Sequence, residues 1–195
     1  MLKTFLLGLL FIGPVMATDT QQNFEVLISE DQIHQRAKEI AQQIDQEYQG
    51  KEIILIGVLK GAIYIAADLL SEITVPCTIE FLRASSYGQN GTKSGALTLH
   101  GLEQLSLKDK HVIIVDDIFD TGKTMTKIKE QILLQEPASL KTLVLLLKNK
   151  SRSISALPDY VLFPVENEFV IGYGLDYKEH YRGLRGIYRV TGGFE

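Results

Sequence analysis

The chain has 195 residues, of which 45% are hydrophobic and 23% are charged, and its formal net charge at pH 7 is -4. This composition is ordinary for a globular protein, and the length suffices for one domain with a sizeable core. The negative balance argues against a primary role in nucleic-acid binding. The single cysteine, Cys77, excludes an internal disulfide framework.

The first 17 residues have the pattern of a secretory signal peptide. Lys3 precedes an apolar run that continues to Ala17, where small residues suit a cleavage site. The run is short for a membrane span. A start at Met16 is the alternative, because it would leave an ordinary cytosolic protein. We therefore divide the chain into a signal-peptide-like or misassigned segment, 1–17, and a single domain, 18–195.

The first half of this domain predicts helices that alternate with buried strands. Ser29, followed by two acids, is typical of a helix start, and apolar residues then recur on one face up to Ile44. In chain order we expect a helix from Ser29, a strand over 53–58, a helix over 63–70 and a strand over 78–82. Residues 85–101 are polar, contain glycines and form a long connection for a compact domain, so they predict a functional flap.

The second half continues the alternation. We expect strands over 112–115, 143–147, 160–163 and 169–171, and a helix over 125–135. Strands that are apolar on both faces and alternate with helices predict an α/β fold with a parallel sheet covered on both sides. Ligands of such sheets bind beyond the carboxyl ends of the strands, so polar residues that follow different strands should converge there.

One strand end carries the strongest chemical signal. The apolar run 112–115 is followed by Asp116 and Asp117, then by a loop of small and polar residues, 120–124, and a helix start. Loop amides and a helix N-terminus point donors at an anion, which predicts a phosphate cradle. The two acids cannot sit against phosphate, so they should face ribose hydroxyls or a hydrated Mg²⁺.

A nucleotide-triphosphatase P-loop is the competing interpretation, because Gly122, Lys123 and Thr124 imitate the end of that motif. The motif requires a glycine five residues before Gly122, where the backbone turns around a phosphate. That position holds Asp117, whose carboxylate would repel a polyphosphate. We therefore reject the P-loop interpretation.

The segment 112–124 resembles the phosphoribosyl-diphosphate (PRPP) signature of the type I phosphoribosyltransferases. Other segments resemble the hypoxanthine-guanine enzymes of that family in the same chain order: 58–62, 85–88, 147–148 with Arg152, 169–177, and 181–182. The resemblance runs from about Glu25 to Tyr188. Several ordered matches are far more specific than the signature alone.

The resemblance implies a type I phosphoribosyltransferase fold with a small hood and a mobile flap. It implies transfer of phosphoribosyl from PRPP to hypoxanthine in purine salvage, giving IMP and pyrophosphate, with guanine as a further acceptor and Mg²⁺ as cofactor. It also implies a cytoplasmic homodimer or homotetramer with no nucleic-acid or membrane partner. The sequence leaves the use of guanine or xanthine and the subunit number open.

The resemblance also assigns roles to residues. Asp120 is the expected general base, and Asp176 is the expected Mg²⁺ ligand. The expected substrate-binding residues are Lys60, Gly61, Ser86, Tyr87, Asp116, Asp117, Thr121, Gly122, Lys123, Thr124, Lys148, Phe169, Val170 and Arg182.

Within that set, the loop 120–124 should hold the 5′-phosphate, and the acidic pair should hold the ribose. An ammonium at Lys148 can donate to the purine 6-oxo group, Phe169 should stack on the purine, and the Val170 carbonyl should accept from a purine edge. Arg182 and the Lys60–Gly61 backbone should bind pyrophosphate, and in the family that peptide bond is often cis. The family commonly has Glu where Asp116 stands.

Two rival functions remain open at this stage. One is a non-catalytic sensor of PRPP or a nucleotide with the same fold, against which Lys148, Phe169 and the predicted flap argue. The other is an exported protein that binds a nucleoside or sugar phosphate. Processing of the N-terminus would distinguish this second rival from a cytoplasmic enzyme.

Overall fold

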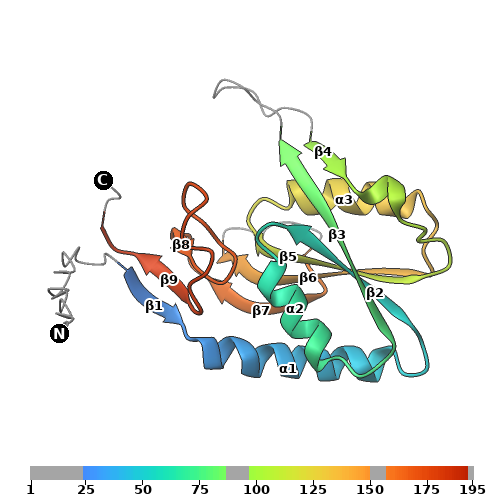
Figure 1. Ribbon diagram of the computed structural model, residues 1–195, viewed down its shortest axis with the longest axis horizontal. Helices are drawn as coiled ribbons and strands as arrows, with labels where there is room; N and C mark the ends of the chain where they lie inside the picture. The colour runs from blue at the N-terminus through green and yellow to red at the C-terminus, as the bar shows by residue number, and fades with distance from the viewer. Residues whose placement is uncertain (1–23, 87–96, 150–156, 193–195) are drawn as a thin grey trace, which may run out of the picture.

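The computed structural model describes residues 24–86, 97–149 and 157–192. Its main sheet has six strands in the order β4-β3-β2-β5-β6-β7 (Figure 1). These strands are β2 (Ile53–Leu59), β3 (Cys77–Ser86), β4 (Leu97–His100), β5 (His111–Phe119), β6 (Ser139–Lys148) and β7 (Tyr160–Val165). All neighbouring pairs are parallel except β3 and β4, which are antiparallel. The predicted parallel α/β sheet is therefore confirmed.

Helices cover both faces of this sheet. The helices α1 (Glu30–Glu47) and α2 (Ile63–Glu72) lie on one face, and α3 (Lys123–Leu133) lies on the other (Figure 1). Alternate residues of β5 supply the two cores, since successive side chains of a strand point to opposite faces. Ile113 and Val115 join the cluster under α1 and α2, whereas Val112 and Ile114 join the cluster under α3.

The start of α1 illustrates how local sequence sets an element. The Ser29 hydroxyl accepts a hydrogen bond from the Gln32 amide at 3.3 Å, and the Gln32 side chain accepts one from the Ser29 amide at 2.9 Å. This reciprocal arrangement is a capping box, which satisfies two amides that the helix cannot pair internally. The helix start predicted at Ser29 is confirmed.

A second, three-stranded sheet forms a hood beside the main sheet. Its order is β1-β9-β8, with β1 (Phe24–Ile28), β9 (Ile187–Val190) and β8 (Val170–Ile171). β9 pairs antiparallel with both neighbours, so the two ends of the described chain lie together (Figure 1). The hood that the family resemblance implied is present.

Several predicted boundaries differ from the structure, and β6 begins at Ser139 rather than at residue 143. β5 continues to Phe119, because its ladder with β6 extends that far, so both acids lie inside the strand rather than after it. α3 begins at Lys123 and not at residue 125. At the base of the predicted flap, β3 pairs antiparallel with β4, and Arg83 lies opposite His100. A short 3₁₀ helix, Leu102–Gln104, follows β4. The predicted flap's remaining residues, 87–96, lie outside the described residues.

Among the residues that the structure describes, no helix is long and apolar enough to cross a membrane. The segment 1–17 falls outside those residues.

Candidate active site

A cleft of about 360 Å³ opens at the carboxyl ends of β2 and β5. Its walls come from three separate stretches of the chain: the end of β2 with the loop after it, the acidic part of β5 with the start of α3, and the loop between β8 and β9. The lining residues are Val58, Leu59, Lys60, Gly61, Ala84, Asp116, Asp117, Ile118, Thr124, Asp176 and Arg182. Seven of the predicted site residues therefore share one cleft, as expected for this edge of a parallel sheet.

All three stretches approach one another closely at Gly61. A Cβ on Gly61 would lie 1.6 Å from Oδ2 of Asp117, and a Cβ on Gly174 would lie 1.9 Å from the Gly61 carbonyl oxygen. Only glycine allows backbones to approach so closely. The cis peptide bond lies between Leu59 and Lys60. The family resemblance had placed it at Lys60–Gly61, one bond too late.

The acidic pair has little solvent around it. Asp116 is 8% exposed, and its Oδ1 accepts a hydrogen bond from the Asp117 amide at 3.0 Å. Asp117 Oδ1 accepts one from the Ile118 amide at 2.8 Å. Burial raises the pKa of both carboxyls, and the charge of Asp117 raises the pKa of Asp116 further. Two carboxyls of this kind are costly to ionise in the free protein.

The phosphate loop forms a smaller pocket of about 190 Å³ that adjoins the cleft, since Asp116, Ile118 and Thr124 line both. Gly122 has a φ of 71° and precedes the first turn of α3, and its carbonyl accepts from the Thr126 amide at 2.9 Å. A Cβ on Gly122 would meet the Phe119 ring at 2.7 Å. The ring of Phe119 therefore packs directly against the loop at Gly122.

The loop between β8 and β9 supplies one acidic and one cationic side chain. Arg182 Nη1 donates to the Gly174 carbonyl at 2.7 Å, and Nη2 lies 2.7 Å from Oδ1 of Asp176. Oδ2 of Asp176 accepts from the Glu179 amide at 2.8 Å. The arrangement places a carboxylate that suits a hard cation and a guanidinium that suits phosphate at the same wall.

Comparison with known proteins identifies the family of this chain. The sequence model of the phosphoribosyl transferase domain matches residues 29–178. The chain belongs to the phosphoribosyltransferase family. The hypoxanthine-guanine phosphoribosyltransferase of Streptococcus pneumoniae is 39% identical over 160 residues, covering 82% of this chain and 89% of the relative. The hypoxanthine phosphoribosyltransferase of Haemophilus influenzae is 38% identical over 174 residues, covering 88% and 97%.

Solved structures agree with the sequence relatives. A crystal structure of a hypoxanthine-guanine phosphoribosyltransferase from Bacillus anthracis superposes with a TM-score of 0.79 at 39% identity, covering 85% of this chain and 98% of that chain. A hypoxanthine phosphoribosyltransferase from Trypanosoma cruzi has a TM-score of 0.78 at 39% identity, covering 85% and 94%. The resemblance inferred from the motifs is thus confirmed at the level of sequence and fold.

The residues expected to bind the purine stand apart from the cleft of this phosphoribosyltransferase. Lys148 ends β6 and is half-buried, and Val170 is buried in β8. Phe169 is 50% exposed, its carbonyl accepts from the Val190 amide at 3.2 Å, and its ring meets Tyr177 edge-on at 5.9 Å. Within the described part of the chain, none of these three lines the cleft.

The remaining predicted residues divide between the loop and the flap. Asp120, Thr121, Gly122 and Lys123 line the phosphate-loop pocket. Ser86 ends β3, but its side chain and all of Tyr87 lie outside the described residues.

Sequence reasoning missed two groups that hold the phosphoribosyltransferase site together. Glu179 lies between Asp176 and Arg182 in the sequence, three residues from each, and contacts both. This spacing was the only sequence signal that could have indicated its contacts with them. Tyr173, with a φ of 50°, donates from its hydroxyl to Asp68 of α2, which also lies 3.1 Å from His34 of α1. No local sequence pattern indicates the contacts of Asp68 with Tyr173 and His34, because the three residues belong to elements that are distant in the sequence.

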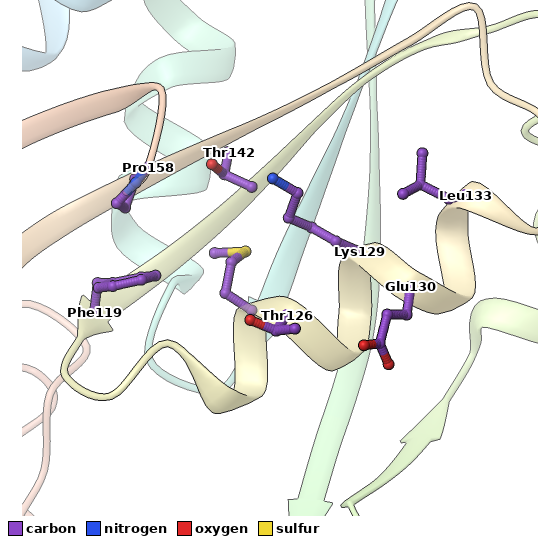
Figure 2. A pocket seen from close by; sticks show the side chains of 8 residues that line it. Phe119, Thr126, Lys129, Glu130, Leu133, Thr142 and Pro158 are labelled. Atoms are coloured by element: carbon purple, nitrogen blue, oxygen red, sulfur yellow. The ribbon is translucent and has the colours of Figure 1, made fainter. Parts of the chain in front are cut away.

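An apolar pocket of about 210 Å³ lies behind the phosphate loop, between α3 and the strands (Figure 2). Phe119 and Met125 line both this pocket and the phosphate-loop pocket. Figure 2 shows Lys129 extending from α3 toward Thr142, whereas Glu130 points the other way. The side chain of Phe119 therefore lies between the phosphate-loop pocket and the apolar pocket.

Proposed function

We propose that this protein is a hypoxanthine phosphoribosyltransferase of purine salvage, which transfers phosphoribosyl from PRPP to hypoxanthine and releases IMP and pyrophosphate. Guanine is a further acceptor, giving GMP. The observation that supports this most is the shared cleft. The cleft and the adjoining phosphate-loop pocket together combine an anion-binding loop, the acidic pair and an Arg–Asp wall, which match the phosphate, ribose and diphosphate of one PRPP molecule.

The phosphate loop binds the 5′-phosphate in this proposal. The amides of residues 120–124 and the N-terminus of α3 donate to the anion, assisted by the hydroxyls of Thr121 and Thr124 and the ammonium of Lys123. Asp116 and Asp117 accept from the two ribose hydroxyls. Those donors would compensate the burial of carboxyls whose pKa values are raised.

The diphosphate lies against the backbone of Lys60 and Gly61 and the guanidinium of Arg182. Asp176 would hold Mg²⁺. Among the described residues no group of three or more acidic, histidine or cysteine side chains could hold a metal, and Mg²⁺ commonly binds through one or two carboxylates together with substrate phosphates and water. Asp176 fits a metal that arrives with PRPP, and when bound it would neutralise charge on the departing pyrophosphate.

The purine lies between the cleft and the hood. Lys148 donates to the 6-oxo group, Phe169 stacks on the ring, and the Val170 carbonyl accepts from the purine edge. Asp120 takes the proton from the attacking purine, a contribution of about 10²–10⁴-fold for such groups. Ser86 and Tyr87 begin a flap that closes over the activated ribose and excludes water.

The test is a spectrophotometric assay with PRPP and Mg²⁺ and each of hypoxanthine, guanine, xanthine and adenine. We expect IMP from hypoxanthine and no product from adenine, whose 6-amino group is a donor facing the Lys148 donor. Absence of any transfer to an oxopurine would refute the proposal.

We also propose that residues 18–195 form a single catalytic domain that acts in the cytoplasm as a homodimer or homotetramer. Purine salvage from PRPP and Mg²⁺ requires the cytosolic pools of both. Sedimentation of the native protein at several concentrations would report the subunit number.

A further inference from the structure

The turn between Asp176 and Arg182 has an unusual backbone. The Tyr177 amide donates to the His180 carbonyl at 3.2 Å, and the His180 amide donates to the Tyr177 carbonyl at 2.9 Å. The two residues between them, Lys178 and Glu179, have φ values of 49° and 69°. A two-residue turn of this kind favours Asn and Gly, because side chains with a Cβ are strained in the left-handed region. Such strain concentrates at functional sites.

Glu179 contacts Arg182 and Asp176, which the proposed function assigns to the diphosphate and its metal, and also the side chain of Lys60, whose backbone it assigns to the diphosphate. Its Oε2 lies 2.6 Å from Nζ of Lys60, and its Oε1 lies 3.4 Å from Nη2 of Arg182. Its amide donates to Asp176. The Glu179 side chain therefore pairs with two cations at once.

The charges of this cluster cancel when no substrate is bound. Lys60 and Arg182 supply two positive charges, and Asp176 and Glu179 supply two negative ones. Nε of Arg182 is buried and has no hydrogen-bond acceptor among the described residues, so the guanidinium keeps a spare donor. The Lys60 ammonium can pair with a diphosphate only if the Glu179 carboxylate moves away.

The contacts of Glu179 suit exchange rather than permanent structure. The side chains of Lys60 and Glu179 are 52% and 64% exposed. Exposed ion pairs of this kind are weak, because solvent screens them and ordering two long side chains costs entropy. An incoming diphosphate with several negative oxygens therefore competes successfully for both cations.

We propose that Glu179 is a displaceable carboxylate that occupies the diphosphate subsite of the free enzyme. It holds Lys60 and Arg182 in place until PRPP binds, leaves when the diphosphate arrives, and returns as pyrophosphate departs. Glu179 is thus a positioning residue that weakens pyrophosphate binding and speeds product release. The inference rests on the proposed function and adds a step to its diphosphate subsite.

The direct test is calorimetric titration of the enzyme with pyrophosphate in the presence of Mg²⁺, comparing the parent with Glu179→Gln. The amide keeps the shape of the side chain and removes the competing charge, so we expect pyrophosphate to bind roughly threefold to tenfold more tightly. The matched control is Glu52→Gln. Glu52 pairs with Lys110 at 3.3 Å at the amino-terminal edge of the sheet, and its loss changes the net charge equally. The control should leave affinity unchanged.

A second variant separates charge from backbone strain. Glu179→Gly relaxes the left-handed conformation, so a purely structural role predicts a rise in thermal stability without tighter pyrophosphate binding. Our proposal predicts tighter binding in both Glu179→Gln and Glu179→Gly. The gain should shrink at high salt and in the Lys60→Gln background, because one of the two competed cations is then screened or absent.

Steady-state kinetics give an independent readout. In Glu179→Gln the KM for PRPP and the inhibition constant of pyrophosphate should both fall, while kcat does not rise. Pyrophosphate affinity equal to or weaker than that of the parent would overturn the inference. If the parent makes no IMP from hypoxanthine and PRPP, the proposed function itself is wrong; an active parent with an unaltered Glu179→Gln affinity removes only the role of Glu179.

Discussion

At the scale of single residues, Asp116 combines a cost for folding with the ribose-binding role that we propose for it. Its carboxyl is buried and its pKa is raised, so the folded protein keeps this proton at pH values where the unfolded chain has lost it. The cost of ionising Asp116 in the folded state is absent below the pKa of an unfolded Asp, about 3.9, and grows as the pH rises toward the raised value. A residue selected for stability alone would not be acidic here.

We therefore predict that Asp116→Asn stabilises the substrate-free protein near neutral pH by ~1–3 kcal/mol, the range for an uncompensated buried polar group. The Asn oxygen can still accept from the Asp117 amide. The gain should vanish as the pH falls below about 3.9, because the parent carboxyl is then protonated in both the folded and the unfolded state. Urea unfolding at several pH values measures this. PRPP binding should weaken in the same variant, and a less stable Asn variant at pH 7 would contradict the account.

Asp120 allows a different separation, between binding and chemistry. Asp120→Asn keeps the shape of the side chain but cannot take a proton, so kcat should fall by about 10²–10⁴-fold while the affinity for PRPP is retained. Single-turnover rates and equilibrium PRPP binding measure the two quantities independently. Normal turnover in this variant would remove Asp120 from the role of general base.

Lys148 should affect the purine and not PRPP. Lys148→Ala removes a charged donor to the 6-oxo group, a contact of ~1.5–3 kcal/mol, so kcat/KM for hypoxanthine should fall roughly tenfold to a hundredfold. Lys141→Ala is the control, because Lys141 lies at the other end of β6 and pairs with Glu47. Equal use of hypoxanthine by Lys148→Ala and the parent would disprove the 6-oxo assignment.

At the scale of elements, the site depends on the contact between the loop after β2 and the loop between β8 and β9. Gly174 has a φ of 99°, and a Cβ there would overlap the Gly61 carbonyl, a backbone atom that cannot rotate away. Tyr173 fixes the same loop from the other side through its hydrogen bond to Asp68. The loop that carries Asp176 and Arg182 is thus positioned by backbone and side-chain contacts together.

Gly174→Ala should push these two loops apart. We expect a loss of stability of ~1–3 kcal/mol from the left-handed backbone and a raised KM for PRPP, because Asp176 and Arg182 move relative to Gly61. Gly183→Ala is a matched control in the same loop, since a Cβ there meets nothing within 4 Å and its φ is ordinary. Thermal unfolding and PRPP kinetics of the two variants measure the difference. Similar behaviour of both would show that the loop contact is dispensable.

These elements also show what sequence could and could not predict. Ser29 predicted a helix start, because its capping contacts lie within three residues. The apolar run 112–115 predicted β5 but not its end, since the ladder to β6 continues through the two acids for reasons that lie in another strand. The antiparallel pairing of β1 with β9 joins residues more than 150 positions apart, so no local pattern indicates it.

The same contrast holds within the site. The motif residues of β5 and its loop were predicted because their spacing carries the chemistry. Glu179 was missed, because its position in a strained turn and its contact with Lys60, 119 residues away, exist only in the folded chain. Residues that bind substrate leave a motif, whereas residues that position them often do not.

At the scale of the whole molecule, the hood sheet joins the two ends of the described chain. β1 begins at Phe24, and its pairing with β9 ties the start of the described chain to its end. Every described strand and helix lies within or after β1.

We predict that a chain beginning at Met16 is fully active and as stable as the full-length chain, because it retains β1 and everything after it. The full-length chain should associate more readily, since an exposed contiguous apolar run promotes self-association. Light scattering and PRPP-dependent activity of the two chains measure both effects. Lower activity of the shorter chain would show that residues 1–15 contribute to the fold.

Mass spectrometry of the native protein, together with fractionation, tests the proposed location. A terminus at Met16 or Ala17 in the cytosol supports it, whereas a terminus at Thr18 outside the cytosol would establish export. The localisation must be measured with the mass, because Ala17 and Thr18 are adjacent and the mass alone identifies the terminus but not the process that produced it.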